Sequence, residues 1–521
     1  MRRIGLTLAI ALAISAPAFA GAAAPQTVIA QGTLRGTTEN GVAVFKGIPF
    51  AAPPIGDLRW RPPQQAPHWK DTRQAIAFGP ICPQAPFGVA KRLKQSEDCL
   101  TLNVWSPRLA ADAKLPVMVW IYGGGFRGGG SSYPYYDGTN LAQHDVVVVS
   151  FNYRLGWLGF FDHPALAQEN AGDATGNYGL MDQIAALKWV RDNIAKFGGD
   201  PKNVTIFGES AGGMSVNDLM TSPKARGLFE KAIAESGLGL YPIPTTKQAQ
   251  AAALAFAIRE HVTGTGETAL ARLRKRPVSA LLADQKNVPL DKATTPMVDG
   301  KILTGQPSVL FARGEIAKVP YLAGSNSYEA SLRKWLSLTD KAILAGFGDK
   351  LPAVRKLYAS DGITGDKALA DQIFGDNIFA AGAHGLAHFV ARAGEPAYVY
   401  HFAYVPTAQR GTTKGVGHGR EVPFVFGLKG YRPFPRLAAQ IEKGTSEKDR
   451  AMIALVERYW TNFAKTGDPN GPGLPHWPAV TAKANHTLVF ADKTKPVAGF
   501  HKRRLGLAYR AWSKRTGMTV P

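Results

Sequence analysis

The apolar positions of the chain follow two patterns, continuous runs and helical spacings. Continuous runs occur at 117–122 and 146–151, and shorter ones occur at 204–207, 233–234 and 319–323. Runs that are apolar on both faces are typical of strands in a sheet that helices cover on both sides. We therefore predict a series of buried strands in one sheet.

Two segments have the spacing of amphipathic helices. Between Asn177 and Gly198 the apolar residues recur at steps of three and four, and Gly198-Gly199 supplies a stop signal. A second helix is predicted over 450–465, and helical insertions are expected at roughly 241–295 and 330–395. Because strands and helices alternate along the chain, the sequence predicts an α/β fold with a parallel sheet.

The first twenty residues have the pattern of an export signal. Arg2 and Arg3 precede an apolar run over 4–14, and Ala18-Phe19-Ala20 forms a small-residue cleavage site. The run is too short to cross a bilayer. We expect a cleaved signal peptide at 1–20 and a soluble mature chain, secreted or periplasmic. No internal repeat or flexible linker divides the rest, so 21–521 is expected to form a single domain.

Composition and charge narrow the classes of function. Apolar residues make up 45% and charged residues 19% of the chain, as in folded globular proteins. The formal net charge is +22, of which Arg2 and Arg3 contribute two, so the mature chain would carry +20. That field favours anionic surfaces or substrates. No nucleic-acid-binding motif gathers the basic residues, so we expect no nucleic-acid partner.

The chain contains two cysteines, Cys82 and Cys99. An exported protein meets an oxidising environment, which favours joining them. We predict a disulfide that closes a loop of about 17 residues and stabilises the fold by roughly 3 kcal/mol.

A candidate nucleophile lies in the segment Gly208-Glu209-Ser210-Ala211-Gly212. The segment follows the strand ending at Phe207 and precedes a helix-compatible stretch at 214–220. This is the setting of a nucleophile elbow, whose sharp turn leaves no room for a Cβ on either side of the serine. The alternative is a serine that caps a helix N-terminus. The strand-turn-helix context favours the nucleophile.

Serine acyl transfer also requires donors for the oxyanion that develops on the substrate. Gly123-Gly124-Gly125 follows the strand at 117–122 and presents unobstructed backbone N–H groups. We predict Gly124, Gly125 and Ala211 as the oxyanion donors. Without Ser210 the same glycines would be interpreted as a flexible turn.

A serine nucleophile needs a base, and the chain has eleven histidines. In α/β-hydrolases the base follows the serine and the acid along the chain. His418 stands out because Gly417 and Gly419 let its imidazole approach closely. His384 and His388 have the i, i+4 spacing of a metal pair but lack the HExxH carboxylate, so they are interpreted as one helix face. We expect no metal and no organic cofactor.

Together with further motifs, these residues make the chain similar to the type-B carboxylesterase family, which includes acetylcholinesterase. The motifs span nearly the whole mature chain: 45–49, 97–105, 152–154, 198–201 and 208–213. The resemblance implies an α/β-hydrolase fold, a large, mostly parallel, twisted sheet with helices on both faces and helical insertions over an active-site gorge. It also implies a serine carboxylic ester hydrolase that forms an acyl-enzyme.

The resemblance assigns the rest of the catalytic triad. The family's acid lies in a Gly-x-Asn-x-x-Glu pattern, matched by 324–329, which implies Glu329 as the acid. The family's histidine motif matches 417–419 with 424–427 behind it, which supports His418 as the base.

Matching also assigns residues around the triad. Cys82 and Cys99 match the family's first disulfide. Glu209 and Ser236 resemble residues that support the triad, and Arg154 with Asp173 resembles a structural ion pair.

The chain departs from cholinesterases inside the predicted disulfide loop. Cholinesterases carry there a tryptophan that binds a quaternary ammonium by cation–π attraction. This chain has Lys91, Arg92 and Lys94 instead, and no tryptophan. We therefore expect neutral or anionic esters, including carboxylate-bearing ones, as substrates. Two rival interpretations are a non-catalytic adhesion module, which the complete set of Ser210, Glu329 and His418 argues against, and a polyanion- or membrane-binding protein.

Overall fold

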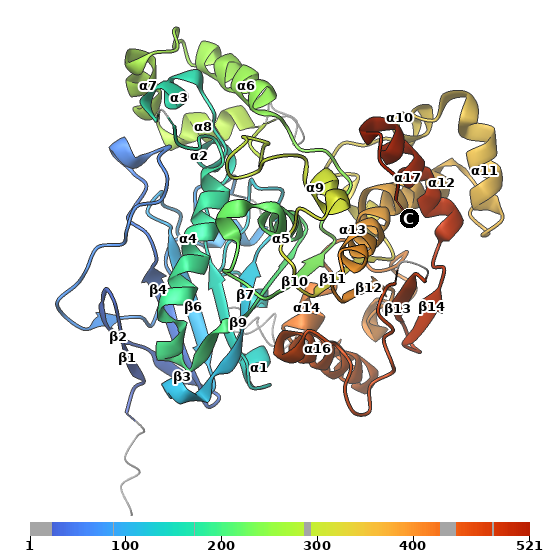
Figure 1. The fold of residues 1–521 in the computed structure, drawn as a ribbon, viewed down its shortest axis with the longest axis horizontal. Coiled ribbons are helices and arrows are strands. Elements are labelled where there is room, and N and C mark those ends of the chain that lie inside the picture. Colours follow the sequence, from blue (N-terminus) through green and yellow to red (C-terminus); the bar gives the residue numbers. More distant parts are fainter. Residues whose placement is uncertain are drawn as a thin grey trace, which may run out of the picture.

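The computed structural model describes residues 23–520 apart from 87, 171, 286–292, 428–443 and 482–483. The predicted signal peptide lies outside the described residues. Within them, a sheet of eleven strands in the order β14-β13-β12-β11-β10-β9-β7-β8-β6-β4-β3 forms the centre of the molecule, flanked by helices (Figure 1). The strands from β8 across to β13 are parallel, and antiparallel strands complete both edges. The sheet is therefore mixed with a parallel centre.

The continuous apolar runs do form the centre of this sheet. They correspond to β7 (Leu115–Ile121), β8 (Val147–Phe151), β9 (Gly199–Glu209), β10 (Lys231–Glu235) and β11 (Tyr321–Asn326). Every residue of β8, β10 and β11 is buried, which explains why no alternation appears in their sequences. β9 is longer than predicted because its first residues, largely polar, extend the strand before the apolar run.

Six further strands of the large sheet lie outside the predicted apolar runs, and two of them, β3 and β14, form its edges. The large sheet is completed by β3 (Thr37–Glu39), β4 (Val42–Pro49), β6 (Thr101–Ser106), β12 (Ala397–Phe402), β13 (His486–Phe490) and β14 (Lys495–Ala498). A separate small sheet contains β1 (Gln26–Ile29), β2 (Gly32–Arg35) and β5 (Arg73–Gln74).

Both predicted amphipathic helices are present. The first is α4 (Tyr178–Asn193), which continues as a 3₁₀ turn over Ile194–Phe197 and ends at Gly198 with a φ of 80°. The second is α16 (Glu447–Thr466), whose N-terminus is closed by a capping box between Ser446 and Asp449. The glycine stop of the first helix is thus confirmed.

The two predicted insertions are helical. The first contains α6 (Thr246–Arg259), α7 (Glu267–Arg274) and α8 (Val278–Asp284), and the second contains α10 (Asp340–Ala345), α11 (Leu351–Ala359), α12 (Asp366–Phe374) and α13 (Ala381–Arg392). In Figure 1 the first set lies at the upper left and α10, α11 and α12 lie at the upper right, whereas α13 packs against β11 and β12. The remaining helices are α1 (Thr139–Ala142), α2 (Gly156–Gly159), α3 (Pro164–Glu169), α5 (Ala211–Thr221), α9 (Pro307–Arg313), α14 (Val422–Val425) and α17 (Lys502–Thr516).

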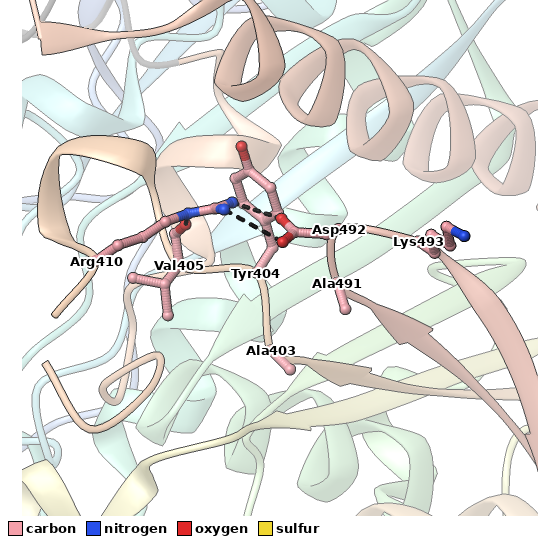
Figure 2. A pocket seen from close by; sticks show the side chains of 7 residues that line it. All are labelled: Ala403, Tyr404, Val405, Arg410, Ala491, Asp492 and Lys493. Carbon is pink, nitrogen blue, oxygen red and sulfur yellow. Dashed lines mark hydrogen bonds and ion pairs between the residues drawn. The ribbon is translucent and has the colours of Figure 1, made fainter.

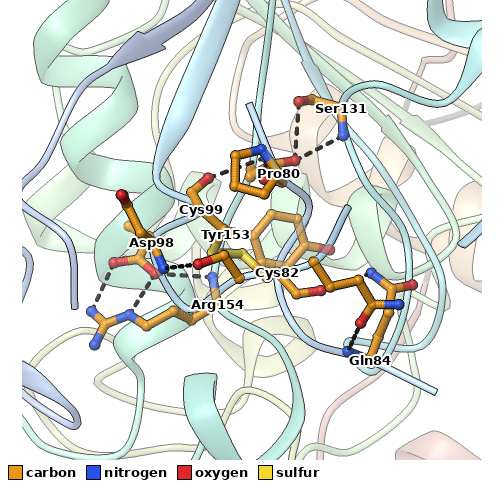
Figure 3. The surroundings of a disulfide bond; sticks show 12 residues. Pro80, Cys82, Gln84, Asp98, Cys99, Ser131, Tyr153 and Arg154 are labelled. Carbon is orange, nitrogen blue, oxygen red and sulfur yellow. Dashed lines mark hydrogen bonds and ion pairs between the residues drawn. A yellow bond between two sulfur atoms is a disulfide. The ribbon is translucent and has the colours of Figure 1, made fainter. Parts of the chain in front are cut away.

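The predicted disulfide between Cys82 and Cys99 is present, and both residues are buried (Figure 3). The amide of Asn152 lies beside it, donating to the carbonyls of Pro80 and Cys99 at 3.0 and 3.1 Å and accepting from the N–H of Ser131 at 2.9 Å. The disulfide loop is therefore anchored to the sheet end where β8 stops.

Among the described residues, no helix has both the length and the apolar character needed to cross a bilayer.

Candidate active site

Ser210 lies in a sharp turn between β9 and α5. Its backbone has φ 57° and ψ −120°, a conformation that non-glycine residues rarely adopt. Its N–H donates to the Glu235 carbonyl at 2.9 Å, which fixes the turn to the end of β10. A Cβ at Gly208 or Gly212 would lie 2.6 or 1.9 Å from the Ile121 carbonyl oxygen. The predicted need for glycine on both sides of the serine is therefore confirmed.

Three residues distant in sequence meet at this turn. The Nε2 atom of His418 lies 2.8 Å from Ser210 Oγ, and its Nδ1 atom lies 2.6 Å from Glu329 Oε2. The Glu329 side chain is fully buried, and that of His418 is 11% exposed. The serine, imidazole and carboxylate thus form a continuous hydrogen-bonded chain that ends at a hydroxyl.

The loops that carry the acid and the imidazole are bonded directly to each other. Glu329 follows β11, and the loop around His418 runs alongside that strand end. The Tyr328 N–H donates to the Val416 carbonyl at 2.8 Å, and the His418 N–H donates to Ser331 Oγ at 2.9 Å. Because backbone contacts fix both loops together, the distance between imidazole and carboxylate does not depend on side-chain packing alone.

Ser236 and Glu209 take positions around the triad. The Ser236 hydroxyl donates to Glu329 Oε1 at 2.6 Å, and the Asn326 N–H donates to the same oxygen at 2.8 Å. These two bonds orient the carboxylate so that its other oxygen faces His418. Glu209 Oε1 lies 3.1 Å from His418 Nε2, on the serine side of the ring.

Buried carboxylates dominate the electrostatics of the site. Burial lowers the pKa of His418, but the charges of Glu209 and Glu329 outweigh burial and raise that pKa to about 10. Burial raises the pKa of Glu209 to about 7 and that of Glu235 to about 8, and it raises the pKa of Glu421 well above its usual range. The site therefore favours an imidazolium, the species that forms when His418 takes a proton from Ser210.

The glycine-rich loop lies against the serine. A Cβ at Gly123 would come within 3.0 Å of the Ser210 Cβ, so only glycine permits this approach. Gly124 and Gly125 have φ values of 113° and 62°. Neither of their N–H groups has an acceptor within the described part of the chain. Ala211, the first residue of α5 and the neighbour of Ser210 in the chain, is buried.

One predicted contact is wrong. Arg154 does not pair with Asp173 but with Asp182, whose two carboxylate oxygens accept from the guanidinium at 2.8 Å each. Asp182 lies in the second turn of α4 and is fully buried beside the arginine, whereas Asp173 is exposed in the preceding loop. A buried guanidinium needs a buried partner, which the helix supplies.

His384 and His388 both lie on α13, as predicted, and both are buried. His384 Nδ1 lies 3.0 Å from Asn485 Oδ1. Within the described residues, no group of three histidine, cysteine, aspartate or glutamate side chains is arranged to hold a metal ion.

Several residues near the site escaped sequence analysis. Glu421 lies three residues after His418, and its carboxylate accepts from the Asn326 amide. In the sequence, the one sign of a buried acid here is a single glutamate directly before the apolar segment 422–426. Phe379 contacts the His418 ring, and Gln84 holds the glycine-rich loop. Neither position carries a local sequence signal, because each reaches the site through the tertiary fold.

A separate surface cavity of about 590 Å³ lies beside the end of β13 (Figure 2). Its lining includes the ion pair between Arg410 and Asp492, with Tyr404 beside them. It contains no serine, cysteine or histidine. The described lining of this cavity therefore lacks a nucleophile of the kind that the serine turn carries.

The mixed sheet and the strand-turn-helix serine define the class of protein as an α/β-hydrolase. The sequence model of the carboxylesterase family matches residues 23–506. The fumonisin B1 esterase of Sphingopyxis macrogoltabida is 38% identical over 84% of this chain and 82% of its own length. Carboxylesterase 1C of Rattus norvegicus is 37% identical over 88% and 87%, respectively.

A solved structure with a similar fold is that of a PNB esterase. It has a TM-score of 0.77 and 33% identity, and the match covers 92% of this chain and 99% of that one. The chain belongs to the carboxylesterase family, and it is a serine hydrolase of carboxylic esters other than choline esters.

Proposed function

We propose that Ser210, His418 and Glu329 are the catalytic triad of this carboxylesterase. The observation that carries the proposal is the position of His418, whose ring nitrogens lie 2.8 Å from Ser210 Oγ and 2.6 Å from Glu329 Oε2. A base must lie within hydrogen-bond reach of the proton that it removes, and these distances satisfy that requirement. The strained backbone of Ser210 presents the hydroxyl at the carboxyl end of the sheet.

The proposed reaction has two halves. Ser210 Oγ attacks the ester carbonyl carbon while His418 Nε2 accepts the hydroxyl proton, and the N–H groups of Gly124, Gly125 and Ala211 bind the oxyanion. The carbon–oxygen bond to the alcohol breaks, and the alcohol leaves with the proton from His418. Water then attacks the acyl-enzyme by the same route and releases the acid. Glu329 stabilises the imidazolium in both halves.

Kinetics of single variants test the triad. Ser210→Ala and His418→Ala should each lower kcat for p-nitrophenyl butyrate by at least about 10⁴-fold, because a serine hydroxyl is a weak nucleophile without its base. Ser360→Ala and His261→Ala are matched controls at exposed positions and should retain full activity. Hydrolysis that survives in Ser210→Ala would overturn the proposal.

We further propose that the substrates are neutral or anionic esters, including esters that bear carboxylates. Lys91, Arg92 and Lys94 are exposed in the disulfide loop, where a cationic substrate would be repelled. The relative whose name is fumonisin B1 esterase supports an ester other than a choline ester as the substrate.

A cationic pocket supports the same preference. It has a volume of about 410 Å³ and includes Ser331, whose hydroxyl accepts from the His418 N–H. Its lining carries three basic side chains, Arg333, Lys334 and Lys367, and two acidic ones, Asp340 and Asp371, which both pair with Arg333. The net charge of the lining is therefore +1.

Salt dependence tests the preference for anionic substrates. The value of kcat/KM for a succinate half-ester should fall steeply with ionic strength, while that for neutral p-nitrophenyl butyrate should not. The steep dependence should weaken in a Lys334→Gln/Lys367→Gln variant. Equal salt dependence for the two esters would contradict the preference and leave the triad proposal intact.

We also propose that residues 1–20 are a cleaved export signal and that 21–521 form one domain. The buried disulfide supports export. One buried apolar cluster that runs from Ile29 to Trp512 supports a single domain. N-terminal sequencing of the protein recovered outside the cytoplasm should begin at Gly21, and an N-terminus at Met1 would contradict cleavage.

A further inference from the structure

Phe379 lies against the imidazole that the triad uses. Its ring centroid is 5.0 Å from that of His418, with 52° between the ring planes, and its side chain is 1% exposed. Phe379 also makes an edge contact with Phe374 at 5.8 Å, and both belong to a small apolar cluster with Ala330, the residue after Glu329. One aromatic cluster therefore adjoins both the base and the acid.

Phe379 is carried by an unusual backbone. Residues Gly375–Ala380 form a π-helical turn between α12 and α13, so the helical path is continuous from Asp366 to Arg392. A π turn holds one more residue than an α turn, which changes the direction of the side chains that follow, and such turns often occur at functional sites. Gly375 faces the acid, since a Cβ there would lie 3.8 Å from the Glu329 Cβ. The turn thus adjoins both partners of the imidazole–carboxylate bond.

A buried ion pair joins the π-helical turn to α17. Arg504 of α17 places Nε 3.0 Å from Asp376 Oδ2, and Gln372 donates to Asp376 Oδ1 at 2.9 Å. The side chains of Arg504 and Asp376 are 4% and 2% exposed. The Arg504 guanidinium also lies over the Tyr358 ring at 5.4 Å. Arg504 Nη1 also lies 3.3 Å from Oδ2 of the partly exposed Asp361. Loss of Arg504 would leave the buried Asp376 carboxylate without its guanidinium and would disturb the turn, because an unpaired charge is costly when buried.

We propose that Phe379 is a positioning residue for His418, and that Arg504 of the C-terminal helix keeps it in place through Asp376. The ring fixes the plane of the imidazole between Glu329 and Ser210 and keeps water away from the bond between His418 and Glu329. Small displacements of a catalytic group lower the rate of the chemical step strongly. The inference rests on the proposed triad. It adds a contact from the π turn and α17, two segments that contain no residue of the triad.

A KM–kcat comparison separates positioning from a merely structural role. Phe379→Ala should lower kcat for p-nitrophenyl butyrate by about tenfold or more while KM stays within about threefold, because the substrate still binds and the base is misplaced. Phe379→Leu, which keeps the apolar bulk, should restore most of kcat. The melting temperatures of both variants show whether they are folded. A folded Phe379→Ala variant with the kcat of the parent would overturn the inference.

A double-mutant cycle tests the path from α17. Arg504→Gln should lower kcat as Phe379→Ala does, and the double variant should be no slower than Phe379→Ala alone, because both changes act on one contact. Arg503→Gln removes the same charge from the exposed neighbouring position and should leave kcat unchanged. If Arg504→Gln does not fold, the isosteric Asp376→Asn replaces it in the cycle. If the effects of the two substitutions on kcat were fully additive, the proposed support of Phe379 by Arg504 would be overturned.

These outcomes are distinguishable from failure of the triad itself. If Ser210→Ala retained activity, the proposed function would fail whatever the Phe379 variants did. If Ser210→Ala were inactive and the Phe379 and Arg504 variants were fully active, the triad would stand and the positioning role would be refuted.

Discussion

Gln84 and Gly129 are joined by two hydrogen bonds through one side chain. The Gln84 Oε1 atom accepts from the Gly129 N–H at 2.8 Å, and its Nε2 atom donates to the Gly129 carbonyl at 2.6 Å. Gln84 is buried inside the disulfide loop, and Gly129 closes the glycine-rich loop that begins at Gly123. The disulfide loop therefore supports the loop proposed to bind the oxyanion.

Loss of this support should slow catalysis more than it weakens binding. In Gln84→Ala the glycine-rich loop loses both bonds, so its N–H groups should no longer be held where the oxyanion forms. We expect kcat to fall about 10- to 100-fold with little change in KM, since a lost oxyanion donor costs about 10² to 10³ in kcat. Steady-state kinetics measure both constants.

The control for this change is Gln64→Ala, at an exposed position where the side chain donates to the Pro62 carbonyl. It should behave like the parent. Unchanged kcat in a folded Gln84→Ala variant would show that the glycine-rich loop holds its shape alone.

The disulfide should contribute to stability. Replacing both Cys82 and Cys99 by serine removes the cross-link from a 17-residue separation. The free energy of unfolding should fall by roughly 3 kcal/mol, because the unfolded chain regains conformational freedom. Denaturant titration of the oxidised parent and the double variant measures the difference. A difference below about 1 kcal/mol would contradict this expectation, which follows from the entropy of closing the loop in the unfolded chain.

Glu209 should control the pH dependence of turnover. Its negative charge raises the pKa of His418, and His418 must be unprotonated to act as a base. Glu209→Gln removes that charge, so the pKa of His418 should fall and the acidic limb of the kcat/KM profile should move to lower pH. Glu267→Gln, at an exposed position, should leave the profile in place. An acidic limb that stays fixed, or moves to higher pH, would contradict this assignment.

The amino-acid sequence predicts the central strands and the position of Ser210, but not the short strands of the small sheet. The central strands were predictable because β7 and β8 are buried on both faces and so leave continuous apolar runs. The short edge strands β1 and β5 were not, since partly exposed strands of two to four residues carry little pattern. Ser210 could be located from its glycines, because a sharp turn restricts the residues beside it.

Partners that the tertiary fold selects could not be predicted. Arg154 is followed in the sequence by two acidic residues, Asp173 and Asp182. It pairs with Asp182 because that carboxylate is buried beside it, which the sequence does not reveal. Phe379 is likewise one of many aromatic residues in a helical insertion. Its direction depends on a π turn that is held by Arg504, more than a hundred residues later.

Buried His384 should make the fold sensitive to acid. Burial lowers its pKa from 6.5 to about 4 in the folded protein. Above pH 6.5 His384 is unprotonated in both the folded and the unfolded protein, so the full stability is present. Below pH 6.5 only the unfolded chain binds the proton, so the free energy of unfolding falls until the pH reaches the folded pKa. At pH 5 this effect should cost roughly 2 kcal/mol. Denaturant titrations at pH 7 and pH 5 measure it.

The His384→Phe variant isolates this contribution, because it keeps an aromatic ring beside Phe500 and removes the titration. Its loss of stability between pH 7 and pH 5 should be smaller than that of the parent by about the same amount. An equal loss in both proteins would show that His384 is not responsible.

In the proposed mechanism His418 makes the Ser210 hydroxyl reactive. Mass-spectrometric peptide mapping after treatment with a fluorophosphonate tests it most directly. We expect one covalent adduct on Ser210, which is absent in Ser210→Ala and forms far more slowly in His418→Ala. An adduct on a different residue, or ester hydrolysis that continues after treatment with no adduct on Ser210, would contradict it.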